Sequence, residues 1–75
     1  MQCLNDLKVG KSCIIEKILT KGAMRRRFLD IGLTENTKVS CAGASPMGDP
    51  RAYLIRGAVI AIRSEDCADI FIREE

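Results

Sequence analysis

The sequence predicts a mainly β fold: a small barrel of five short strands, with one helix inserted after the first strand and a short helical turn before the last. Three observations support this prediction. Short segments rich in apolar and β-branched residues are separated by turn formers. Only one segment shows a clear helical repeat of apolar residues. Closing such a small sheet into a barrel would remove its exposed strand edges.

Turn residues set the bounds of the five expected strands. These strands occupy residues 11–19, 37–42, 51–56, 58–63 and 69–73. In the second of them, alternation places Val39 and Cys41 toward the interior. The run 58–63 is almost continuously apolar, so we expect it to be the central strand. The last strand, 69–73, is a candidate free edge through which the chain would form weak homo-oligomers.

Short segments precede or connect these strands. Before the first strand, Leu4, Leu7 and Val9 are expected to pack against the body of the domain. Gly57 marks a tight hairpin between two strands. Ser64 is expected to cap the single helical turn that it begins, because two acidic residues follow it in the first turn.

The helix is expected over residues 21–33. Its apolar stripe, at positions i, i+4 and i+7, consists of Met24, Phe28 and Ile31. Thr20 is a candidate N-cap, and Gly32 is suited to the left-handed conformation that ends a helix. We expect the stripe to pack on the open end of the barrel.

The charges of this helix are placed against its macrodipole. Arg25, Arg26 and Arg27 lie near its start, where anions are favoured, and Asp30 lies near its end, where cations are favoured. The Arg26–Asp30 pair has i, i+4 spacing in the less favourable orientation. Local helix stability therefore does not explain the arginines, and solubility or a binding partner explains them better.

Length and charge exclude several classes of protein. Seventy-five residues allow one domain, residues 1–75. The net charge of +2 is too balanced to indicate a nucleic-acid-binding protein. No apolar run approaches the roughly 18 residues of a membrane span, and the N-terminus does not resemble a signal peptide. We expect a cytoplasmic protein that reaches the inner membrane face only through a partner.

The four cysteines are interpreted as packing residues. They are Cys3, Cys13, Cys41 and Cys67, with no Cys-x-x-Cys pair, and the chain has no histidine. Disulfides are disfavoured in the cytosol, and four-thiolate zinc sites usually contain closely spaced ligand pairs. A structural metal or a redox pair is the alternative, but we expect no metal site and no cofactor.

The sequence resembles the FeoA family of small bacterial proteins associated with ferrous-iron uptake. The most specific feature is Arg-Phe-Leu-Asp-Ile-Gly-Leu at 27–33, followed by Gly-Asp-Pro at 48–50. The resemblance covers essentially the whole chain. It implies an SH3-like barrel and action on FeoB, a membrane iron permease with a G-protein domain. A similar domain forms the C-terminal part of iron-dependent repressors. One departure is Glu35-Asn36, where the family often has Pro-Gly.

Other classes of function have weaker support in the sequence. An enzyme is not expected, because the chain has no histidine, no paired nucleophile and base, and no glycine-rich phosphate loop. Tyr53 alone cannot line the aromatic groove that binds proline-rich peptides. Nucleic-acid binding is not expected either, since three consecutive arginines point in different directions and stacking aromatics are scarce. Transition-metal or nucleic-acid binding, as in a repressor-type barrel, is the alternative hypothesis.

We therefore expect a non-enzymatic accessory protein that regulates a FeoB-type permease by protein–protein contact. Two surfaces are candidates, the arginine side of the helix and the projecting turn 45–50. The residues expected to contact the partner are Arg25, Arg26, Arg27, Met47, Gly48 and Asp49. A solvated helix and an ordinary turn are the alternative interpretations. The sequence does not indicate whether the partner would be activated or inhibited.

Overall fold

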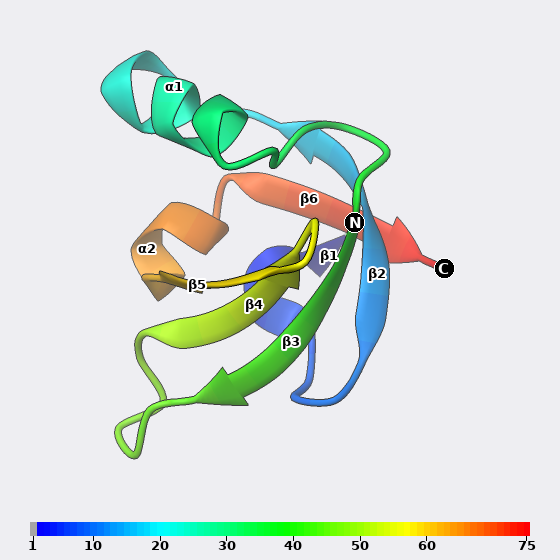
Figure 1. Ribbon diagram of the computed structural model, residues 1–75, viewed down its shortest axis with the longest axis vertical. Helices are drawn as coiled ribbons and strands as arrows, with labels where there is room; N and C mark the ends of the chain where they lie inside the picture. Colours follow the sequence, from blue (N-terminus) through cyan, green and yellow to red (C-terminus); the bar gives the residue numbers. More distant parts are fainter. Residues whose placement is uncertain (1) are drawn as a thin grey trace.

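The computed structural model describes residues 2–75 (Figure 1). Its strands are β1 (Gln2–Cys3), β2 (Ser12–Ile18), β3 (Lys38–Ala44), β4 (Arg51–Ile55), β5 (Ala58–Ile62) and β6 (Ile70–Glu74). Its helices are η1 (Leu4–Asp6, a turn of 3-10 helix), α1 (Gly22–Asp30) and α2 (Ser64–Cys67). The mainly β class, the helix after the first long strand and the helical turn before the last strand are all confirmed.

All strands belong to one curved antiparallel sheet. Its order is β1-β6-β2-β3-β4-β5, and register shifts at Ile15/Lys17 in β2 and Cys41/Gly43 in β3 bend it around the core. The sheet has one strand more than the five predicted, because the two residues of β1 are too few to show an alternating pattern. The edge strands β1 and β5 do not pair with each other, so hydrogen bonding does not close the sheet.

Two predicted strand positions are wrong. β5, expected at the centre, is an edge strand, and its Val59 is 65% exposed. β6, expected at an edge, lies between β1 and β2. A continuous apolar run indicates a strand but does not identify its neighbours in the sheet. For β6, the outer neighbour is β1, which comes from the opposite end of the chain and pairs with it. The prediction that 69–73 is a free edge is therefore wrong, because β1 pairs with residues 71 and 72.

The core lies inside the curved sheet and includes three of the four cysteines. Val39 and Cys41 point inward as predicted, and Cys13 and Cys67 are also buried. All four cysteines are free, with Cys3 half-buried, so the packing interpretation is confirmed for the three buried ones. The buried hydrophobic residues in the described part of the chain are Leu4, Leu7, Cys13, Ile15, Phe28, Leu33, Val39, Cys41, Tyr53, Ile55, Ile62, Cys67, Ile70 and Ile72.

The segment before β2 packs on the core through η1. Leu4 and Leu7 are buried as predicted, but Val9 is 52% exposed, because the chain turns back toward β2 at this point. The guanidinium group of Arg51 donates hydrogen bonds to the backbone carbonyls of Asn5 and Leu7. This arginine, in β4, therefore holds η1 against the end of the sheet.

Helix α1 is shorter at both ends than predicted. Its N-cap is Lys21 without a side-chain hydrogen bond, so the prediction of Thr20 as N-cap is wrong. Thr20 is instead buried. At the other end Gly32 has a φ of +84°, and the N–H of Leu33 donates to the carbonyl of Phe28 at 2.8 Å. This is the pattern of a Schellman motif, and it confirms Gly32 as the helix stop.

The apolar stripe of α1 faces the core as predicted. Phe28 is only 2% exposed, and Met24 and Ile31 pack against the core while partly buried. The helix lies at one end of the curved sheet (Figure 1). The stripe therefore sets which side of α1 is available to a partner.

Two turns place a residue other than glycine in the left-handed region. Asn36, at the departure from the family pattern, has a φ of 68°. Arg56 and Gly57 have φ values of 49° and 86°, which is a two-residue type I′ hairpin between β4 and β5 and confirms the predicted turn. The Arg56 side chain donates to the carbonyl of Gly32 at 2.9 Å and to Thr37 Oγ1 at 3.3 Å. It thereby links this hairpin to the end of α1.

Candidate protein-binding site

The three arginines of α1 are all exposed, but they do not form one surface. Arg25 donates a hydrogen bond to the backbone carbonyl of Ile18 at 3.1 Å and lines a pocket on one side of Phe28. Arg27 lines a groove on the other side of that ring, and Arg26 lines neither. Two separate sites, each with one arginine of the helix, therefore flank α1.

The first site, which we call the α1–β2 pocket, has a volume of about 380 Å³. Its lining residues are Ile18, Arg25, Phe28, Leu29, Leu33, Thr34, Glu35 and Asn36. Leu29 is 51% exposed and Leu19, next to the pocket in the chain, is also exposed. Such a pocket suits one large apolar side chain, with a carboxylate of the same partner near Arg25.

The second site, which we call the α1–β5 groove, has a volume of about 260 Å³. Helix α1 and strand β5 form its two walls. Its lining residues are Met24, Arg27, Phe28, Ile31, Ile60, Ala61, Ile62, Arg63 and Asp66. Six of its nine lining residues are apolar, but its exposed lining is about as polar as it is apolar, because Arg27, Arg63 and Asp66 also line it.

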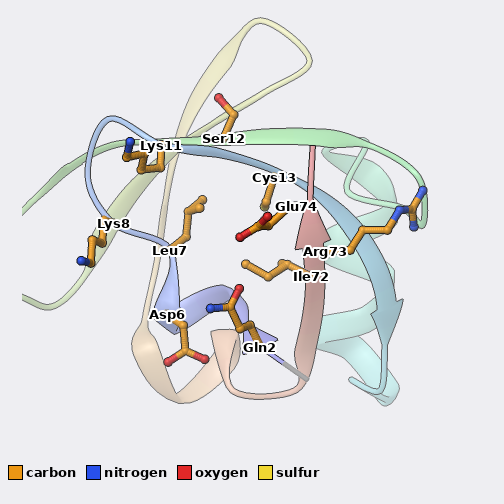
Figure 2. A pocket seen from close by; sticks show the side chains of 10 residues that line it. All are labelled: Gln2, Asp6, Leu7, Lys8, Lys11, Ser12, Cys13, Ile72, Arg73 and Glu74. Carbon is orange, nitrogen blue, oxygen red and sulfur yellow. The ribbon is translucent and has the colours of Figure 1, made fainter.

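A third pocket, of about 360 Å³, lies between the N-terminal segment and strands β2 and β6 (Figure 2). Figure 2 shows Cys13 and Glu74 pointing into it, while Arg73 points away, where it pairs with Glu16. Burial raises the pKa of the Cys13 thiol to about 11, and the charge of Glu75 adds to this shift. A thiol that stays protonated is a poor nucleophile and a poor metal ligand, so this pocket does not suggest catalysis.

The core around Tyr53 contains a second protonated thiol. Burial raises the pKa of Cys67 to about 11, and its Sγ lies 3.6 Å from the hydroxyl of Tyr53. Burial also raises the pKa of Tyr53, whose hydroxyl donates to the carbonyl of Leu4 at 3.4 Å. Tyr53 is thus part of the core and cannot contribute to an exposed aromatic groove.

The turn 45–50 projects as predicted, but one of its candidate residues has a structural role. Met47 is 90% exposed at the turn, and Gly48 has a φ of +84°. The Oδ1 atom of Asp49 accepts a hydrogen bond from the backbone N–H of Ser64 at 2.9 Å. Asp49 therefore caps α2. The prediction of Ser64 as side-chain cap is wrong, since the N-cap is Arg63.

The structure does not bring the two predicted contact surfaces together. Helix α1 and the turn between β3 and β4 lie at opposite ends of the longest axis of the molecule (Figure 1). Arg26 and Asp30 also form no ion pair within 4 Å; the ion pairs found within residues 2–75 are Lys38–Glu75, Arg63–Glu65 and Arg73–Glu16. The sequence therefore identified the exposed residues of α1 but missed both pockets, which depend on contacts with distant strands.

Within residues 2–75, no three side chains of the metal-ligating types Cys, Asp and Glu come together in a group suited to hold a metal ion. None of the helices in this range has the length and apolar character needed to cross a membrane.

A family model described as "FeoA domain" matches residues 2–74. A curated relative is the Fe(2+) transport protein A/Fe(2+) transporter FeoB fusion protein of Porphyromonas gingivalis, 28% identical over 67 residues. That alignment covers 89% of this chain but only 8% of the fusion protein. The chain thus spans a small part of that relative's length.

Solved structures match nearly the whole chain. The FeoA protein of Chlorobium tepidum has a TM-score of 0.91 at 26% identity, covering 97% of this chain and 70% of that one. An FeoA-like protein of Clostridium acetobutylicum has a TM-score of 0.85 at 28% identity, covering 96% and 84%.

A third structure establishes the type of barrel. The zinc complex of FeoA from Stenotrophomonas maltophilia, described as a prokaryotic SH3 domain protein, has a TM-score of 0.81 at 19% identity. That alignment covers 97% of this chain and 91% of the other. The predicted SH3-like fold is confirmed.

Proposed function

Because this chain belongs to the FeoA family of accessory proteins of ferrous-iron transport, we propose that it binds the cytosolic part of a FeoB-type membrane permease and catalyses no reaction itself. The relative in which the two proteins are fused into one chain supports this partnership. A fusion keeps its two parts at a high effective concentration, which is useful when the separate proteins must bind each other. The chain would reach the membrane only through this partner.

The observation that carries the proposal is the α1–β2 pocket. It combines buried apolar walls, an exposed Leu29 and the guanidinium group of Arg25 at its rim. Burying one large apolar side chain there would contribute roughly 1.5–3 kcal/mol. A carboxylate near Arg25 would add a charge-assisted hydrogen bond and fix the orientation of the partner.

The cysteine and arginine side chains support a protein-binding function rather than catalysis. Cys13 and Cys67 are buried thiols whose pKa values lie near 11, so they are protonated at neutral pH. The divergence of Arg25 and Arg27 also gives no continuous basic face of the kind that nucleic acids require. Protein binding is therefore better supported than the metal-binding or nucleic-acid-binding alternatives.

The test is a titration of the chain with the purified cytosolic domain of the FeoB-type permease from the same organism, by isothermal titration calorimetry. We expect the combined change Arg25→Gln and Leu29→Ala to weaken binding by about tenfold or more. Met47→Ala, at the far end of the molecule, tests the second surface and should have a smaller effect. A thermal melt of each variant controls for folding, since Arg25 also bonds the backbone of Ile18.

Two results would contradict the proposal. If the unmodified chain does not bind the domain, the partnership is wrong. If Arg25, Arg26, Arg27 and Met47 can all be replaced together without weakening the complex, both predicted contact surfaces are wrong.

A further inference from the structure

Strand β5 has backbone hydrogen-bonding groups on its outer edge that no strand uses. It is the last strand of the sheet and pairs only with β4 among the described residues. The two-residue turn makes Ile55↔Ala58 the first hydrogen-bonded pair of this hairpin. Hydrogen-bonded and non-hydrogen-bonded pairs alternate from there. The backbone N–H and C=O groups of Ala58, Ile60 and Ile62 therefore bond to β4. The N–H and C=O groups of Val59 and Ala61 point away from the sheet.

These outward groups lie beside the α1–β5 groove. Ala61 lines the groove and is exposed, and Val59 is 65% exposed. Residues of α1 and β5 line the same groove, so the helix bounds the space next to the free edge. An exposed edge strand beside a groove that can receive side chains is the arrangement in which domains bind an extended peptide by strand addition.

Resting on the protein partnership proposed above, we propose that the α1–β5 groove binds one extended segment of the permease, which adds to β5 as a further strand. The segment would form backbone hydrogen bonds with Val59 and Ala61. Alternate apolar side chains would enter the groove between Met24 and Ile60. Arg63 pairs with Glu65, whereas Arg27 forms no ion pair within residues 2–75, so the segment would carry an acidic side chain opposite Arg27.

The shape of the groove favours a segment of another protein over a second copy of this chain. A second copy pairing through its own β5 would bring its own α1 toward the same space. A groove of about 260 Å³ accommodates side chains of one extended segment, not a folded domain. Leu54, which faces Val59 on the outer side of the hairpin, stays outside this groove.

The first test is hydrogen exchange of individual backbone amides by NMR, with and without the permease's cytosolic domain. In the free chain we expect fast exchange at Val59 and Ala61 and slow exchange at Ile60 and Ile62, which bond to β4. On binding, exchange at Val59 and Ala61 should slow by about tenfold or more, because their N–H groups become hydrogen-bonded. This measurement needs no substitution.

The second test is the Ala61→Pro variant, which removes one outward N–H group. Proline is tolerated where a strand edge is free, so the hairpin should remain folded, and a thermal melt checks this. The matched control is Ala61→Val, which changes the side chain and keeps the N–H group. We expect Ala61→Pro to weaken binding of the domain by about tenfold and Ala61→Val, which alters the groove lining but keeps the N–H group, to weaken it less.

The outcomes separate this inference from the proposed function. If the change at Arg25 weakens the complex but the exchange rates at Val59 and Ala61 do not change on binding, strand addition is wrong and the proposed partnership is still supported. If exchange at Val59 and Ala61 slows when the concentration of this chain is raised in the absence of the permease domain, a second copy occupies the edge. That result would overturn the proposal. Absence of binding by the unmodified chain would overturn both.

Discussion

Replacing Phe28 by alanine tests the main packing contact between α1 and the sheet. The ring is 2% exposed and forms part of the wall of both sites that flank the helix. A buried aromatic side chain removes about 150–250 Å² from water, which at about 25 cal/mol per Å² corresponds to roughly 4–6 kcal/mol. Phe→Ala changes in protein cores cost about 3–5 kcal/mol. A chain of this length is expected to have a total stability of about 4–11 kcal/mol.

The assay is urea-induced unfolding, followed by far-UV circular dichroism. With a slope of about 1 kcal/mol per molar urea, Phe28→Ala should lower the midpoint by about 3 M or leave the chain unfolded in buffer. The control is Leu29→Ala, the next residue of the same helix, which is 51% exposed. Its effect should stay near 0.5 kcal/mol. Equal midpoints for the two variants would refute the placement of Phe28 in the core.

Three further predictions concern stability measured by the same assay. Asp49→Ala should cost about 0.5–2 kcal/mol, because it removes the acceptor that caps α2, and an unchanged midpoint would argue against this cap. Gly32→Ala should cost more than about 1 kcal/mol, since φ is +84° there, whereas Gly43→Ala has open space and no positive φ and should cost less. The native pKa values of Cys13 and Cys67, about 11, exceed the roughly 8.5 of a free thiol. Their contribution to stability is therefore fully present below about pH 8.5 and lost as the pH rises through 11; midpoints that stay constant over this range would contradict burial of both thiols.

The helix and most strands were predictable because local patterns determine them. The i, i+4, i+7 spacing identified the buried side of α1, and Gly32 identified its end. The strands predicted at 37–42 and 51–56 match β3 and β4 within two residues, since alternation and turn formers act over a few positions. The two-residue β1 was missed because it is too short to carry a pattern.

The candidate site was only partly predictable. The exposure of Arg25 and Arg27 followed from their place on the helix, but which pocket each lines depends on β2 and β5, which are distant in the chain. The cap that Asp49 gives to the N–H of Ser64 spans 15 positions and left no sequence signal. A residue expected to contact a partner therefore proved to hold two elements of the fold together.

By itself, the sequence determined the five longer strands, one amphipathic helix with exposed arginines, and a family motif recognisable from residues 27–33 and 48–50, but not the two-residue β1. Only the tertiary structure decided that β5 is a free edge and β6 an interior strand. The physical reason is that periodicity depends on neighbours in the chain, whereas strand order depends on which distant segments pair. The pockets that flank α1 exist only once that pairing has formed.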